Sequence, residues 1–179
     1  MARHGAVLAL AAVWACGSVS AGELSARWSG GARGSLRGPA HAGWCATSGW
    51  LELTLMRGDT GVAAAVFPIG ALRAGVYPIV AAGVPVHPGA AVALRWLDST
   101  AVQQYAAQAG TLRLEQVSPH EVSGTMTATL RAVGSAPTAG SASGIVTLAG
   151  RFTRVPVATA PDGCPAAAAL TRHPVTGVH

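Results

Sequence analysis

The fold of this chain is decided by an alternating stretch at residues 50–67, WLELTLMRGDTGVAAAVF. Its first half alternates leucine with glutamate and threonine, which is the period of two expected for a strand that buries one face. The GDTG segment at 58–61 supplies turn chemistry, because glycine tolerates positive φ and aspartate hydrogen-bonds its own backbone. Residues 62–67 then continue as an apolar partner strand. The stretch therefore predicts a β-hairpin whose leucines face a core.

Similar patterns recur outward along the chain. They predict further strands at residues 24–28, 76–80, 91–97, 111–117, 122–133 and 145–157. The glycine-rich stretch 29–43 is predicted as loop or weak strand. Only residues 99–108, with a capping serine, good helix formers and a closing Gly110, predict a short helix. The predicted fold class is therefore all-β: an antiparallel β-sandwich or open β-barrel with one short helix.

The length of 179 residues suits one domain with a sizeable core. Residues 1–21 have the layout of an export signal: Arg3 and His4 are basic, an apolar stretch follows, and the last five residues are small. The all-β domain is expected at 22–157, and a mostly irregular tail at 158–179. The mature protein is therefore expected in the periplasm or outside the cell.

Two processing sites compete at the end of this signal. Cleavage after Ala21 would leave Gly22 as the first residue of a soluble protein. Alternatively, the segment Val13-Trp14-Ala15-Cys16 is similar to a bacterial lipobox, although tryptophan is the wrong kind of residue for it. Lipidation of Cys16 would anchor the protein to the envelope, and this is the sole membrane contact that the sequence predicts.

Cys45 and Cys164 form an even pair once Cys16 is removed or lipidated. In an oxidising compartment such a pair predicts a disulfide. The bond would close a loop of more than a hundred residues, for which the chain-entropy argument gives roughly 4 to 5 kcal/mol of stabilisation. A catalytic thiol at Cys45, with His41 four residues earlier and Asp59 as the orienting carboxylate, is the weaker interpretation. A catalytic cysteine of this kind normally begins a helix, whereas Cys45 precedes a predicted strand.

The cationic residues are twelve arginines with no lysine, and the net charge is +5. Without lysine the chain cannot form a Walker-type phosphate loop, a Schiff-base enzyme or a Ser-x-x-Lys nucleophile. The arginines stand singly, with no basic run, so no nucleic-acid partner is expected.

Other catalytic motifs are incomplete. His120-Glu121 begins like the zinc-protease motif H-E-x-x-H, but Gly124 occupies the fifth position and the segment is predicted as strand. The chain has no G-x-S-x-G nucleophile elbow. Glu52 and Glu115 fall on the polar faces of strands, and we interpret them as partners of arginines. No catalytic residue, metal site or cofactor is therefore predicted.

The tryptophans are the best candidates for a binding role, because large aromatic side chains often line apolar or carbohydrate pockets. Trp96 alternates with Val92 and Leu94 and is predicted in the core. Trp50 shares its strand face with Glu52, opposite the leucines. Trp50 is therefore the predicted ligand-binding residue, on a second, exposed or pocket-lining surface.

Four short phrases carry a resemblance to known proteins: RGDTGV at 57–62, AGVYP at 74–78, VSGTM at 122–126 and LAGRF at 148–152. They resemble segments of bacterial secreted or lipid-anchored β-proteins of uncharacterised function. The resemblance covers roughly residues 22–157. It implies a β-sandwich or open barrel, and it implies no activity.

The sequence thus predicts a non-enzymatic exported envelope protein that binds an apolar ligand, a glycan or another envelope component. The alternative is an extracytoplasmic hydrolase whose acidic residues converge only in the fold. Acidic side chains gathered with histidine in one pocket would favour the hydrolase, whereas scattered acids favour the binding protein.

Overall fold

The computed structural model describes residues 22–81, 86–97, 101–133 and 144–160. The predicted signal, Cys16, Cys164 and most of the predicted tail lie outside these residues. Within the described part the chain is all-β, as predicted.

The described residues form ten strands. Their bounds are β1 Glu23–Gly30, β2 Gly34–Pro39, β3 His41–Cys45, β4 Trp50–Arg57, β5 Thr60–Phe67, β6 Gly75–Val80, β7 Gly89–Leu97, β8 Val102–Val117, β9 Glu121–Ala132 and β10 Ile145–Ala160. The predicted hairpin at 50–67 is confirmed as β4 and β5, whose two-residue turn has Gly58 at a φ of +58°. A glycine at the first turn position suits that conformation.

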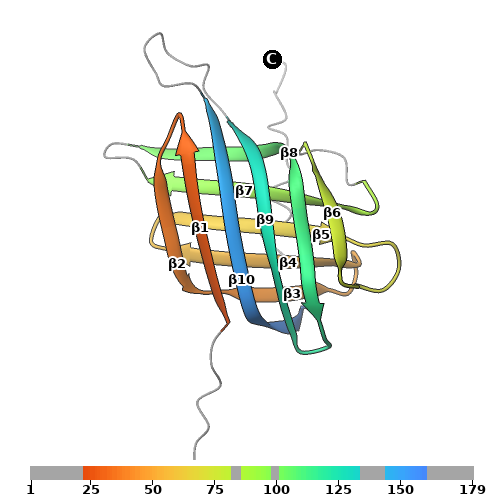
Figure 1. Cartoon of the computed structure of the whole chain (residues 1–179). Helices are drawn as coiled ribbons and strands as arrows, with labels where there is room; N and C mark the ends of the chain where they lie inside the picture. The colour runs from red at the N-terminus through yellow and green to blue at the C-terminus, as the bar shows by residue number, and fades with distance from the viewer. Residues whose placement is uncertain (1–21, 82–85, 98–100, 134–143, 161–179) are drawn as a thin grey trace, which may run out of the picture.

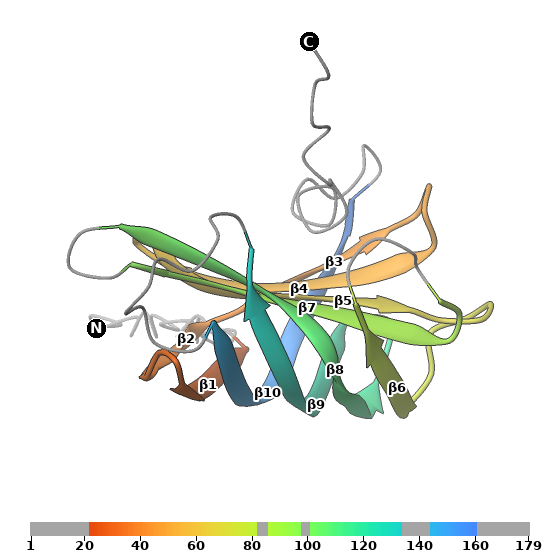
Figure 2. The same cartoon turned by 90° about the horizontal axis from the view of Figure 1, so that it is seen from above.

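The strands lie in two layers that cross steeply (Figures 1 and 2). The front layer contains β2, β1, β10, β9, β8 and β6, hydrogen-bonded in that order. The rear layer contains β3, β4, β5 and β7. The strands β8 and β10 belong to both layers, because residues 102–106 of β8 pair with β7 and residues 157–160 of β10 pair with β3. All ten strands therefore belong to one continuous sheet.

Both long strands change layer at an irregularity in their pairing. In β8 the register shifts between Ala107 and Ala109, and Gly110 follows at a φ of +147°. A Cβ at Gly110 would collide with the carbonyl oxygen of Thr127. In β10 the register shifts after Phe152, and the Arg154 amide, at a φ of +47°, donates to Ser123 Oγ over 2.8 Å. Bulges of this kind bend strands and increase their twist.

The core fills the space between the layers. From the rear layer it takes Leu51, Leu53 and Leu55, the leucines of the alternating stretch, which are no more than 2% exposed. The front layer contributes large side chains from four strands: Leu24, Trp28, Leu112, Leu114, Met126, Leu130, Leu148 and Phe152. Trp96 packs against this core and is only partly buried.

The structure corrects the predicted short helix and the predicted strand directions. The predicted short helix at 99–108 is wrong, because Val102 onward lies in β8 and pairs with β7, and this tertiary pairing overrides local helix propensity. For the glycine-rich stretch 29–43, predicted as loop or weak strand, the strand alternative is confirmed, because the stretch contains β2 and most of β3. The sheet is mixed rather than purely antiparallel, since β10 runs parallel to β3 and β6 parallel to β7. In addition, β10 continues to Ala160, beyond the domain end expected at 157.

Candidate functional site

The outer face of the front layer is polar and exposed. Because side chains alternate across a strand, each buried core residue is flanked by residues that point outward. The outward residues of β1, β2, β8, β9 and β10 are mainly arginine, serine and threonine. They include Ser25, Arg27, Ser35, Arg37, Thr111, Arg113, Thr125, Thr127, Thr129, Arg131, Thr147 and Arg151.

The strand register aligns some of these residues in one row across the layer. The pairs along this row are Arg37 with Ser25, Ser25 with Arg151, Arg151 with Thr125, and Thr125 with Arg113. We call these five residues the arginine row. Neighbouring strands lie about 4.8 Å apart, so successive arginines are about 10 Å apart at their backbones, with a hydroxyl residue between each two.

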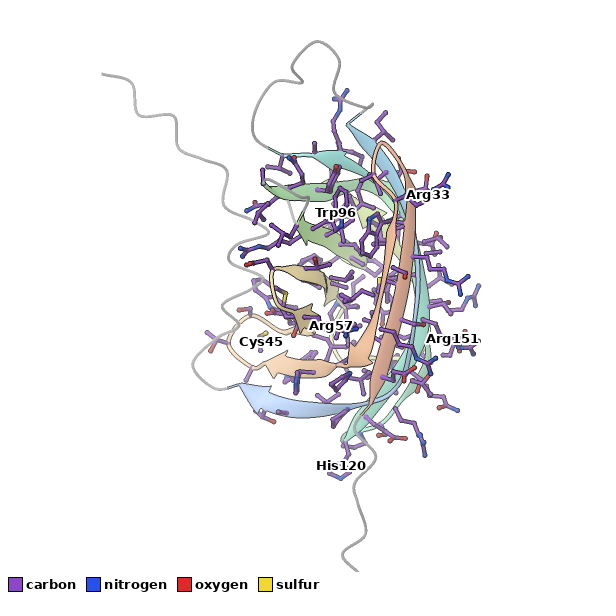
Figure 3. All side chains as sticks on the ribbon, turned by 90° about the vertical axis from the view of Figure 1, so that its left-hand side faces the viewer. Arg33, Cys45, Arg57, Trp96, His120 and Arg151 are labelled. Atoms are coloured by element: carbon purple, nitrogen blue, oxygen red, sulfur yellow. The ribbon has the colours of Figure 1, made fainter. Side chains whose placement is uncertain are left out.

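An open depression of ≈ 530 Å³ lies over one end of the arginine row. Its lining includes Arg37, Ser25, Arg151 and Thr125 of the row, together with Arg27 from the neighbouring register position. Figure 3 shows Arg151 pointing away from the molecule on the front-layer side. Guanidinium and hydroxyl groups therefore surround a space that is open to solvent, and Ala26, Leu36, Ala149 and Gly150 also line it.

Two carboxylates partly balance the positive charge of this face. Glu23 Oε1 accepts from Arg37 Nε over 2.7 Å, and Glu115 Oε2 lies 3.6 Å from an Arg151 nitrogen. Both pairs are exposed, so solvent weakens them. Within the described part of the chain, Arg27, Arg113 and Arg131 form no ion pair with an acidic side chain. The face therefore keeps an excess of cationic groups that can donate hydrogen bonds.

The predicted ligand-binding residue, Trp50, lies on the other side of the molecule. It begins β4 in the rear layer, is half-buried, and meets Phe67 edge to face, with ring centroids 5.5 Å apart. Its Nε1 is buried and has no hydrogen-bond partner among the described residues. Trp50 is thus outside the leucine core, but it does not belong to the arginine row.

Cys45 ends β3, fully buried, and its register partner in β10 is Ala160. The described chain therefore stops beside Cys45, four residues before Cys164, and the disulfide stays a prediction. The weaker thiol-nucleophile interpretation combined Cys45 with His41 and Asp59. His41 lies four residues earlier in β3, about 13 Å away along a strand, and Asp59 pairs with Arg95 at 3.2 Å. These three groups do not converge.

The structure also places the remaining candidate acids and histidines. Glu115 faces Arg151, as interpreted, whereas Glu52 is buried on the outer side of the rear layer instead of lying on an open polar face. His120 and Glu121 both donate backbone amides to Ser118 Oγ in the turn before β9. Among the described residues no group of three His, Cys, Asp or Glu side chains could hold a metal ion. The same residues contain no helix long and apolar enough to cross a membrane.

Sequence reasoning missed the arginine row. Each of its arginines stands alone in the sequence, and only the register of β1, β2, β8, β9 and β10 brings them together. The available signal was the outward parity of arginine and threonine in the predicted strands, but parity does not reveal which strands are neighbours.

Comparison of the chain with known protein families, with curated proteins and with solved structures finds no match. The resemblance to bacterial secreted β-proteins therefore stays untested. Any function must be argued from the faces of the molecule itself.

Proposed function

We propose that this chain is an exported, non-enzymatic protein of the cell envelope that binds an acidic polysaccharide through its arginine row. Export follows from the signal-like residues 1–21, with cleavage after Ala21 or lipidation of Cys16 as the two forms of the mature protein. We also infer that the two layers form a β-sandwich, an inference supported by the continuous side-chain core between them. The observation that carries the proposed binding is the alternation of arginine and hydroxyl residues across the front layer.

This alternation suits an anionic chain that also carries hydroxyl groups. A guanidinium donates two parallel hydrogen bonds to a carboxylate, sulfate or phosphate group, and such charge-assisted bonds are stronger than neutral ones. Ser25 and Thr125, which lie between the arginines, can donate to and accept from sugar hydroxyls. The backbone spacing of about 10 Å between arginines favours an extended ligand with repeated charges over a single small ion.

A polysaccharide fits this face better than a nucleic acid. Proteins that bind single strands stack the bases on exposed aromatic rings. The described outward residues of β1, β2, β8, β9 and β10 include no Trp, Tyr or Phe, and Trp28 of β1 points into the core. Duplex recognition commonly inserts a helix or a two-stranded ribbon into a groove, whereas this face is a broad sheet.

The distribution of described acids supports a binding role over the hydrolase alternative. Glycoside hydrolysis uses two carboxyl groups about 5 to 10 Å apart on either side of a substrate. Glu23 and Glu115 each face an arginine on the front layer, while Glu52 is buried at the rear and Asp59 lies in the β4–β5 turn. No described feature favours the hydrolase.

Binding of sulfated dextran tests the proposal, with neutral dextran as the uncharged probe of the same backbone. In titration calorimetry we expect the sulfated dextran to bind and the neutral dextran not to bind. Arg113→Gln should weaken binding about tenfold, because a hydrogen bond to a charged group contributes about 1.5 to 3 kcal/mol and about 1.4 kcal/mol corresponds to a factor of ten.

Arg95→Gln is the matched control, because Arg95 is an exposed rear-layer arginine paired with Asp59 at 3.2 Å. It removes the same charge from the other side of the molecule and should leave the affinity nearly unchanged. Equal losses in the two variants would show that net charge alone attracts the polymer. Tighter binding of duplex DNA than of sulfated dextran would also contradict the proposal.

A further inference from the structure

A second outer surface, on the rear layer, has the opposite character. We define the rear patch as Cys45, Trp50, Glu52, Ala65 and Phe67, which lie on the outer side of β3, β4 and β5. Cys45 is 0% exposed, Glu52 6%, Ala65 1% and Phe67 3%. The core cannot bury these side chains, because they alternate with the leucines and valines that face it. Among the described residues no strand lies over this side of the rear layer (Figure 2).

Burial is confined to one end of this side. Moving away from the rear patch, Thr54 and Ala63 are half-buried, and Arg95 and Asp59 are exposed. Whatever shields the rear patch therefore lies over the end that contains Cys45. Phe67, at the end of β5, also contacts the exposed His87 ring at a centroid distance of 6.0 Å. This contact lies at the edge of the rear patch and does not account for the burial of Cys45 and Glu52.

The described chain ends at this same place. Ala160, the last residue of β10, is the register partner of Cys45. Residues 161–179 continue from there, and nineteen extended residues could span about 60 Å. Four neighbouring strands are only about 20 Å wide. The segment is thus long enough to cross the whole rear patch.

The sequence of this segment suits such a return. Pro161-Asp162-Gly163 has strong turn chemistry and would reverse the chain directly after β10. Cys164 follows the turn, and residues 165–170, PAAAAL, are small and apolar. The segment can therefore turn back after β10 and bring small apolar side chains to the rear patch.

We propose that residues 161–179 turn back at Pro161–Gly163 and dock on the rear patch, with the apolar stretch 165–170 covering Ala65 and Phe67. The docked segment gives the apolar outer side of β4 and β5 an intramolecular partner. The predicted bond between Cys45 and Cys164 would lock it in place. That bond forms when the two thiols pass two electrons and two protons to an external disulfide by exchange.

The reactivity of the Cys45 thiol tests docking without the disulfide. In the full chain carrying Cys16→Ser and Cys164→Ser, Cys45 is the only thiol, and its rate of alkylation by N-ethylmaleimide reports how often the rear patch opens. Adding Ala168→Asp and Leu170→Asp places charge in the docking segment. We expect alkylation to become at least about tenfold faster, which corresponds to about 1.4 kcal/mol of lost protection.

Val76→Asp is the control, because Val76 is an exposed apolar residue of β6, outside the rear patch. It should leave the rate unchanged. Equal rates in the docking-segment variant and the Val76 variant would overturn the proposal. A rate in the parent chain that falls as the protein concentration rises would also overturn it, because a second copy would then be the cover.

A cross-linking measurement on the otherwise unaltered chain keeps the proposal testable if the charged variant fails to fold. A benzophenone amino acid in place of Ala168 should form intramolecular cross-links to the peptide that contains residues 62–67, detected by mass spectrometry. Cross-links to front-layer strands, or only between molecules, would contradict docking on the rear patch.

Discussion

The outward positions of the front layer hold exposed residues such as Arg113, Thr127 and Arg151, whereas those of the rear patch hold buried residues such as Glu52 and Phe67. Both faces belong to strands that alternate in the same way and pack on the same core. Alternation therefore determines which side chains leave the core, but it does not determine what they meet outside. The residues of the arginine row are open to solvent, whereas most of the rear patch is buried although it lies on the outer side of the sheet.

The largest expected effect comes from the predicted disulfide at the rear patch. Cys164→Ser should lower the free energy of unfolding under oxidising conditions by about 4 to 5 kcal/mol, the chain-entropy value for a loop of more than a hundred residues. Denaturant unfolding of the wild-type and variant proteins measures the difference. Under reducing conditions the two should become nearly equal.

If mass spectrometry of the exported wild-type protein showed two free thiols, the disulfide would be absent. Cys164→Ser would then not lower the free energy of unfolding by this amount. The rear patch would then be stabilised by packing alone. Thr127→Ala on the front face is the matched comparison, because an exposed substitution away from special features usually changes stability by less than about 0.5 kcal/mol.

The next effect separates the core side of β4 from its outer side. Leu51→Ala should destabilise by about 2 to 5 kcal/mol, because it leaves a cavity in the core. Trp50→Ala should cost well below the roughly 3 to 5 kcal/mol expected for a buried tryptophan, since Trp50 is half-buried and outside the core. Thermal or denaturant unfolding compares the two, and equal losses would place Trp50 energetically in the core.

Trp50→Phe separates the contribution of the indole N–H from that of the ring contact. It retains an aromatic ring to pack on Phe67 and removes the Nε1–H that has no hydrogen-bond partner among the described residues. Removing an unsatisfied buried donor offsets the loss of contact area, so we expect a change within about 1 kcal/mol of the wild type. A larger loss would show that the indole nitrogen is satisfied by a group outside the described residues.

Much of the fold could be predicted from local alternation, and the failures have a common cause. The hairpin at 50–67 was predictable because its strands and its turn are contiguous. The segment 102–108 was misassigned because its alanines and glutamines favour helix, while its strand partners come from β7 and β9. The strands β2 and β3 were underrated because glycine and proline have weak strand propensity, and β3 is held by β10 from the distant end of the domain.

The candidate sites divide in the same way. The parity of Trp50 was predictable, because it depends only on the neighbouring leucines. The arginine row was not, since it needs the register of five strands from across the sequence. The burial of Glu52 was not predictable either, because its parity correctly places it outside the core while the cover over that face is a tertiary feature.

The smallest expected effect tests whether the front face is built for binding rather than stability. Glu23 pairs with Arg37 at 2.7 Å, and their side chains are 47% and 74% exposed. Exposed ion pairs contribute between about 0 and 1 kcal/mol, so Glu23→Gln should change the free energy of unfolding by no more than that.

The same substitution releases the Arg37 guanidinium at one end of the arginine row. Affinity for sulfated dextran should therefore rise, by less than tenfold, and the gain should shrink with added salt as the charges are screened. Calorimetric titration at two salt concentrations measures it, with Asp59→Asn, which releases Arg95 on the rear layer, as the control that should leave affinity nearly unchanged. A weaker affinity after Glu23→Gln would show that the carboxylate itself contacts the ligand, and the arginine row would then not bind by attracting negative charge.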